Sequence, residues 1–152
     1  MKKSAGLLMY RRDATGAVQV LLAHPGGPFW RGKDESAWTI PKGEYVEPEL
    51  ALAAARREFA EETGFEVTPP LLPLGEITQK SGKRVSAWAF QGDCYPARLQ
   101  SNSFDMEWPP RSGRRRSYPE IDRVEWFSLP EARRKLLPTQ CELLHRLERI
   151  LA

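Results

Sequence analysis

Three glutamates near the middle of the chain have the side chains and the spacing that could do chemistry. They lie in RREFAEETGF, residues 56–65. Glu58, Glu61 and Glu62 are three and four residues apart, so a helix would point their carboxylates from one face. Gly64 is typical of a helix end, where the helix dipole is negative and acids are unfavourable. The cluster is therefore either a solvated acidic surface or a site for a hard divalent cation such as Mg²⁺, which prefers oxygen ligands.

The residues around the glutamates resemble the signature of the Nudix family. That signature is a glycine, five residues, a glutamate, seven residues, Arg-Glu, an apolar residue, any residue, Glu-Glu, any residue, a glycine and another apolar residue. So many constrained positions at the correct spacing are not expected by chance. Residues 43–65 fill all of them, with Gly43, Glu49, Arg57, Glu58, Phe59, Glu61, Glu62, Gly64 and Phe65.

The resemblance implies an activity and a metal. Members of the family hydrolyse a nucleoside diphosphate linked to another moiety, and they hold one or more Mg²⁺ or Mn²⁺ ions on a loop–helix–loop. Arg57 and Glu49 match the pair that orients the family's acids, and Arg57 can also pair with Glu61 one turn on. The metal ligands that the resemblance implies are Gly43, through its carbonyl, Glu58, Glu61 and Glu62.

These residue types suit the cleavage of a pyrophosphate bridge by attack of water on phosphorus. A divalent metal neutralises charge on the phosphate and lowers the pKa of bound water. A carboxylate can accept the proton of that water, and we assign catalytic roles to Glu61 and Arg57 without choosing the general base. A covalent intermediate is not indicated, because no Ser/His/Asp set is apparent and His24 and His145 are far apart in the sequence.

A further acid in this family often comes from outside the signature, six residues before a tryptophan that opens the final strand region. YPEIDRVEWF places Glu120 six residues before Trp126. By this resemblance Glu120 is an extra metal ligand or the general base. A solvated acid at a strand edge is the alternative, and Glu107 and Asp122 are competitors for the role.

The segment WTIPKGEYVEP, residues 38–48, narrows the substrate. It resembles the corresponding segment of dinucleoside polyphosphate hydrolases, such as those that cut diadenosine tetraphosphate, more than that of MutT-like sanitising enzymes. Lys42 is a candidate phosphate contact or a solvated lysine beside a turn. Aromatic residues can stack on a nucleotide base, and Trp30 is the candidate we assign to substrate binding. The others are Phe29, Trp38 and Trp108.

Residues 92–119 have little periodicity and much proline, glycine, serine and arginine, which predicts a long irregular loop with a function or with disorder. We expect Arg114, Arg115 and Arg116 to bind the distal phosphates of the substrate, because a guanidinium matches phosphate oxygens two at a time. A solvated loop is the alternative. Two other substrates stay open, an inositol pyrophosphate and a nucleoside triphosphate. Two other functions also stay open: a non-catalytic nucleotide sensor and, least favoured, RNA binding.

Length, composition and charge indicate the domain organisation and the location of the protein. With 152 residues, 41% hydrophobic, 28% charged and a net charge of +3, the chain is expected to be one domain, residues 1–152, in the cytoplasm. No segment reaches the length of a membrane span. Cys94 and Cys141 are expected to be free thiols. The expected partner is a small nucleotide or polyphosphate, and the oligomeric state is left open.

The elements predicted by pattern form an α/β (α+β) fold, and the resemblance implies an α/β/α sandwich with a mixed sheet. The long helix should begin near Pro48 and run to residue 63, burying Leu52, Ala55 and Phe59 while the glutamates face elsewhere. A short helix should follow Pro130. A last helix should cover 139–151, and extended segments should cover 4–11, 18–24, 37–41, 72–80, 84–91 and 122–128.

Overall fold

A six-stranded mixed sheet forms the centre of the computed structural model, which describes residues 2–152. Five strands follow the order β4-β5-β1-β2-β8, and β3 pairs with β1. The β1–β5 pair is parallel and the other pairs are antiparallel. The sheet therefore confirms the predicted mixed α/β class. Its strands are β1 Lys3–Arg12, β2 Val18–Pro25, β3 Lys42–Tyr45, β4 Leu72–Thr78, β5 Arg84–Gln91 and β8 Ile121–Ser128.

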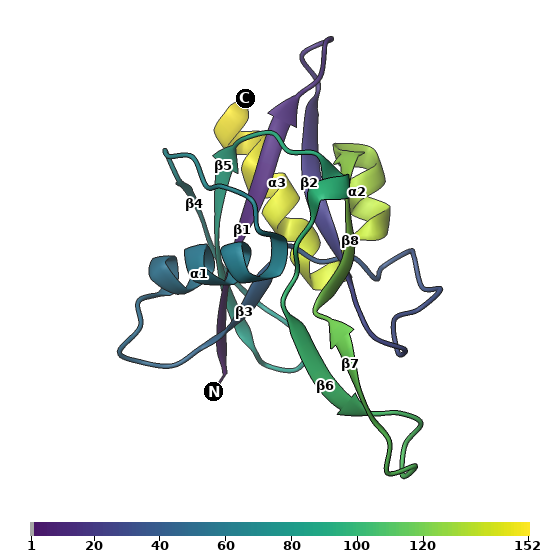
Figure 1. Ribbon diagram of the computed structural model, residues 1–152. Helices are drawn as coiled ribbons and strands as arrows, with labels where there is room; N and C mark the ends of the chain where they lie inside the picture. The colour runs from purple at the N-terminus through teal and green to yellow at the C-terminus, as the bar shows by residue number, and fades with distance from the viewer. Residues whose placement is uncertain (1) are drawn as a thin grey trace.

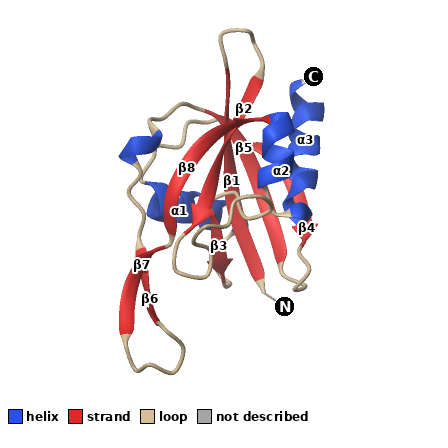
Figure 2. Cartoon of the chain, turned by 90° about the vertical axis from the view of Figure 1, so that its right-hand side faces the viewer, coloured by secondary structure: helices blue, strands red, loops and turns tan. Residues whose placement is uncertain are grey.

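Helices cover both faces of the sheet, as Figures 1 and 2 show. Helix α1, Ala51–Thr63, lies on one face; α2, Leu129–Lys135, and α3, Cys141–Leu151, lie on the other. Because successive residues of a strand point to opposite faces, β1 supplies both layers. Its Ala5, Leu7 and Met9 pack under α1, and its Leu8 and Tyr10 pack towards α3.

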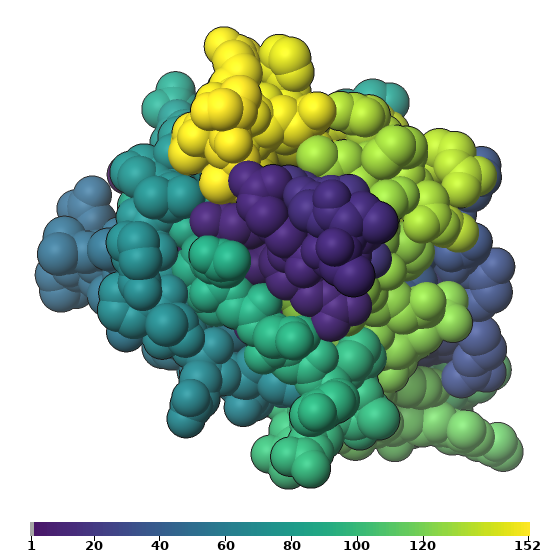
Figure 3. Space-filling model, turned by 90° about the horizontal axis from the view of Figure 1, so that it is seen from above, coloured from purple at the N-terminus to yellow at the C-terminus, as the bar shows by residue number. Residues whose placement is uncertain are grey.

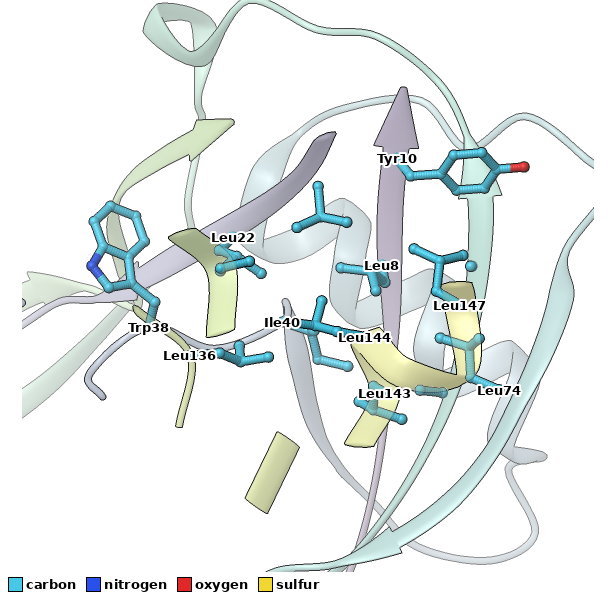
Figure 4. Packing of buried hydrophobic residues seen from close by; sticks show 14 of the residues in the cluster. Leu8, Tyr10, Leu22, Trp38, Ile40, Leu74, Leu136, Leu143, Leu144 and Leu147 are labelled. Atoms are coloured by element: carbon cyan, nitrogen blue, oxygen red, sulfur yellow. The ribbon is translucent and has the colours of Figure 1, made fainter. Parts of the chain in front are cut away.

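Each face of the sheet buries its own apolar cluster. Figure 4 shows the one beneath α3, where Leu144 and Leu147 meet Leu8 and Leu74. In the α1 layer Phe59 stands edge-on to Phe90, with ring centroids 5.4 Å apart, within the range of about 4.5–7 Å that aromatic pairs prefer. These clusters fix the position of α1 relative to β1 and β3, and hence of the glutamates that α1 carries.

The structure corrects three details of the predicted helices. Helix α1 begins at Ala51 rather than near Pro48, and Leu52 is 37% exposed instead of buried. The inward face of α1 consists instead of Ala54, Ala55, Phe59, Glu62 and Thr63. Glu62 is therefore part of the buried face, and the expectation that all three glutamates face elsewhere was wrong.

The expectation that residues 92–119 form an irregular loop was wrong in large part. A short 3-10 helix covers Pro96–Arg98, and a hairpin of β6, Ser103–Glu107, and β7, Arg115–Pro119, extends from the body of the molecule. The Glu107 carboxylate accepts backbone N–H bonds from Arg111 (2.8 Å) and Gly113 (3.1 Å), which orders the turn. This local bonding of a side chain to the backbone has no periodic signature in the sequence.

The base of the hairpin is tied to the last turn of α1. Asn102 N–H donates to the Glu61 carbonyl (2.9 Å), and Gln100 N–H donates to the Thr63 carbonyl (3.0 Å). These carbonyls belong to the group at a helix C-terminus that has no partner within the helix. Glu120 N–H in turn donates to the Asn102 carbonyl (2.8 Å). The helix end thus holds Glu120 beside the glutamates of α1.

The opposite end of the molecule is formed by the β1–β2 turn, which lies in front in Figure 3 with α3 beside it.

Cys94 and Cys141 are both free thiols, as predicted. No helix within residues 2–152 is both long enough and apolar enough to cross a membrane.

Replacing Phe59 by alanine should destabilise the fold by about 3–5 kcal/mol, because it removes a fully buried ring and leaves a cavity. Leu52→Ala on the same helix is the matched control and should cost less than about 1 kcal/mol, since that side chain is partly in solvent. Urea denaturation measures both. Equal losses would show that the inward face of α1 is placed wrongly.

Candidate active site

An acidic hollow of about 340 Å³ lies where α1, β1, β3 and the base of the hairpin meet. Three of its acids come from α1, because Glu58, Glu61 and Glu62 occupy its C-terminal half. Glu120 joins them from the end of β7. The structure therefore brings all four predicted carboxylates to one place. The other lining residues are Ser4, Lys42, Gly43, Glu44, Lys83 and Asn102.

Glu62 is the most deeply buried of these acids, at 8% exposure. Burial, followed by the negative charges of Glu58 and Glu120, raises the pKa of its carboxyl to about 9. Burial and the charge of Glu58 also raise the pKa of Glu120. The hollow thus holds more negative charge than its own cations compensate, and a buried charge without a partner is unfavourable.

Arg57 gathers the acids at the rim of the hollow. Its Nε and Nη2 donate to the two carboxylate oxygens of Glu49 at 2.8 and 2.9 Å, a bidentate pair. Its Nη1 donates to Glu58 at 2.9 Å and reaches Glu61 at 3.3 Å. The bonds to Glu49 raise the pKa of Arg57 further above its usual value. Arg57 therefore sits between the orienting acid and two acids of the hollow.

Gly43 allows the Glu58 carboxylate to approach β3. A Cβ atom at this position would overlap the carboxyl group of Glu58, so no other residue leaves the same space. Strand β3 was not predicted, yet its pairing of Gly43 with Ala5 of β1 places the glycine directly beneath α1. The steric requirement of the Glu58 carboxylate thus explains why this position of the signature is a glycine.

The donor set suits a hard divalent cation, since it consists of carboxylate oxygens and one backbone carbonyl. Among residues 2–152, no three carboxylate, imidazole or thiol side chains converge closely enough to enclose an ion as they stand. Two of the acids, Glu58 and Glu61, are paired with Arg57. Glu62 and Glu120, whose pKa values are raised by burial and then by neighbouring acids, are free of that pairing. The residues therefore fit a hard cation by the type and charge of their donor atoms.

The two other candidates for the further acid have different partners. Glu107 orders the hairpin turn, as described above. Asp122 lies 2.9 Å from Nδ1 of buried His24, whose Nε2 is 2.7 Å from the Lys33 carbonyl. Of the three, only Glu120 lines the acidic hollow.

An aromatic hollow of about 300 Å³ adjoins the acidic one, and Glu120 lines both. Trp30, the predicted base contact, is part of it, and Phe29 beside it is 60% exposed. Trp38, by contrast, is a buried core residue. The remaining lining residues are Pro25, Gly26, Gly27, Phe104 and Met106, of which the last two lie on β6.

A basic hollow adjoins the acidic one on another side, and Lys83 lines both. Lys2, Ser81 and Gly82 complete it. Lys42 lies in the acidic hollow, and burial, followed by the charge of Lys83, lowers the pKa of its ammonium. Lys83 was missed from the sequence, where it stands in an ordinary Ser-Gly-Lys turn that gives no sign of facing the glutamates.

The three arginines predicted to bind phosphate lie outside the acidic hollow. Arg115 and Arg116 are on β7, and Arg114 ends the hairpin turn through a backbone bond to Trp108. All three are exposed, and none lines the acidic hollow. Their predicted role in phosphate binding stays a prediction.

A family model for the NUDIX domain matches residues 2–147. The chain belongs to the NUDIX domain family. The match covers nearly the whole chain and confirms the Nudix hydrolase predicted from residues 43–65. A search of curated proteins gives no match.

Solved Nudix structures share the fold. The Ap4A hydrolase of C. elegans, in a binary complex, aligns with a TM-score of 0.66 at 22% identity, over 97% of each chain. The NUDIX domain of Shewanella oneidensis NrtR, complexed with ADP ribose, aligns with 0.67 at 16% identity, over 99% of this chain and 88% of that one. The MutT protein of Methanosarcina mazei aligns with 0.61 at 19% identity, over 99% and 94%.

Gly43→Ala should displace the Glu58 carboxylate from the hollow, because the added methyl group occupies its place. We expect the fold to survive, since the end of a glutamate side chain can swing away. Mn²⁺ affinity, measured by titration calorimetry, should fall by about tenfold or more. An unchanged affinity would mean that Glu58 does not hold the ion.

Proposed function

We propose that this Nudix hydrolase cleaves dinucleoside polyphosphates, such as diadenosine tetraphosphate, with Mg²⁺ or Mn²⁺. One observation carries the proposal. The acidic hollow is flanked by an aromatic hollow, joined to it at Glu120, and by a basic hollow, joined to it at Lys83. A base can occupy the first and a chain of phosphates can run past the acids to the second. This arrangement suits a substrate that extends to both sides of the cleaved bridge.

Two features favour this substrate over the alternatives. An inositol pyrophosphate has no aromatic ring and would leave the hollow around Trp30 and Phe104 unused. A nucleoside triphosphate would fill the aromatic and acidic hollows and would reach only part of the basic one. The WTIPKGE segment supports the same ranking, and the C. elegans Ap4A hydrolase shares the fold.

A non-catalytic nucleotide sensor is the alternative from another class. The acids argue for catalysis, because a sensor needs to bind phosphate and has no need of a buried carboxylate such as Glu62 beside it.

A cytoplasmic location also stays a prediction.

The charged residues predicted for the site, Gly43 and Lys83 have the following roles in this proposal. Glu58, Glu62, Glu120 and the Gly43 carbonyl would hold the divalent cation, which when bound neutralises phosphate charge and lowers the pKa of coordinated water. Glu61, at 43% exposure, is accessible to solvent and can accept a proton from the attacking water. Arg57 limits where that carboxylate points. Lys42 and Lys83 offset charge on the phosphates.

Glu62→Gln keeps the shape of the side chain and removes an anionic ligand, so we expect kcat to fall by about a hundredfold or more with the fold intact. Glu66→Gln is the matched control, because that acid is exposed just after α1, lies outside the acidic hollow and should leave activity near that of the wild type. Phosphate release in Mg²⁺ measures both. Full activity of Glu62→Gln, or of the wild type in chelator, contradicts the proposal.

Diadenosine tetraphosphate should be cleaved with a higher kcat/KM than ATP, dGTP or 8-oxo-dGTP. Lys83→Ala should raise the KM for diadenosine tetraphosphate more than the KM for ATP, since only the longer chain reaches fully into the basic hollow. Lys80→Ala, in the same turn and outside the hollows described above, is the control. A strong preference for one triphosphate would reverse the ranking of substrates.

A further inference from the structure

The two faces of the β6–β7 hairpin carry different side chains. In an antiparallel pair, residues directly opposite one another share a face, and successive residues alternate between faces. The register pairs Phe104 with Tyr118 and Met106 with Arg116. It pairs Glu107 with Arg115 on the other face. Two neighbouring arginines of β7 therefore point in opposite directions.

The face that carries Arg116 is the face of the aromatic hollow. Phe104 and Met106 line that hollow together with Phe29 and Trp30 of the 26–36 loop. Cross-strand neighbours have Cβ atoms about 4.5–5.5 Å apart, so the long Arg116 side chain starts next to Met106. Arg115 starts next to Glu107, on the side away from the hollow. Arg116 is exposed and has no ion-pair partner within residues 2–152.

Distance along the strand decides what Arg116 can touch. Arg116 is four residues from Glu120, which corresponds to about 13 Å at ~3.3 Å per residue. Phe104 and its partner Tyr118 lie between the two, with ring centroids 6.1 Å apart. A nucleotide with its cleaved phosphates at Glu120 would therefore present its ring, rather than its phosphates, to Arg116.

We propose that Arg116 contacts the base of the substrate at the outer end of the aromatic hollow and thereby selects base-bearing substrates. A guanidinium stacks on aromatic rings and donates hydrogen bonds in the plane of its fork, and both interactions suit a nucleobase. The proposal rests on the proposed function, because it takes the acidic hollow as the place of the phosphates. It replaces, for Arg116, the phosphate contact expected from the sequence.

Two ligands separate a base contact from a phosphate contact. α,β-Methylene-ADP carries a base and methylenediphosphonate carries none, and neither has a phosphoanhydride bridge that the protein could cleave. Titration calorimetry in Mg²⁺ gives their Kd values for the wild type, Arg116→Ala and Arg115→Ala. Arg116→Ala should weaken α,β-methylene-ADP by about three- to tenfold, the range of a partly desolvated cation–π contact, and should leave methylenediphosphonate unchanged. Arg115→Ala should change neither.

Every other pattern overturns the inference. Equal weakening of both ligands would make Arg116 a phosphate contact, and an effect of Arg115→Ala as large as that of Arg116→Ala would make both a diffuse charge effect. No change, or no binding of α,β-methylene-ADP by the wild type, also contradicts it. Failure of the proposed function can be distinguished from failure of this inference, because a protein that cleaves no polyphosphate can still show the predicted pattern of binding.

Discussion

The burial of the Glu62 carboxylate beside Glu58 and Glu120 is the constraint on which the rest of the structure depends. Burial, followed by the charges of Glu58 and Glu120, raises the pKa of this carboxyl to about 9 and disfavours its charged form. A protein that only had to fold would gain by placing an apolar residue there, because the removal of an ionisable group from water costs free energy. A divalent cation that enters the hollow would offset this cost.

The surrounding fold keeps those acids together. Arg57 compensates the acids at the rim while Glu49 holds its guanidinium. Gly43 leaves space beneath Glu58. The end of α1 binds the hairpin base through its unpaired carbonyls, so one set of backbone bonds both ends the helix and positions Glu120. The same hairpin carries Phe104 to the aromatic hollow, which links the acids to the surface that would recognise a substrate.

Sequence reasoning succeeded where a side chain's role is local or the spacing is strict. The clustering of the α1 acids and the pairing of Arg57 with Glu61 followed from helical spacing, and β5 has the predicted bounds, 84–91. It failed where residues that are distant in the sequence determine the position of a side chain or an element. Nothing near Lys83 shows that its turn faces the glutamates, and the proline, glycine and arginine of residues 92–119 conceal a hairpin whose order comes from Glu107 and from the end of α1. Leu52 has an apolar side chain at helical spacing, yet it faces solvent because the sheet meets α1 on the side of Phe59.

The most direct measurement of the central claim is the free energy of unfolding of the wild type and of Glu62→Gln, each with Mg²⁺ and with chelator. A ligand that binds only the folded state stabilises it by about 2.7 kcal/mol at a hundred times its Kd. The account predicts a crossover. In chelator Glu62→Gln is at least as stable as the wild type, because it lacks the buried acid, whereas in Mg²⁺ the wild type gains stability and the variant gains much less. The same response to Mg²⁺ in both proteins, or none in the wild type, would contradict it.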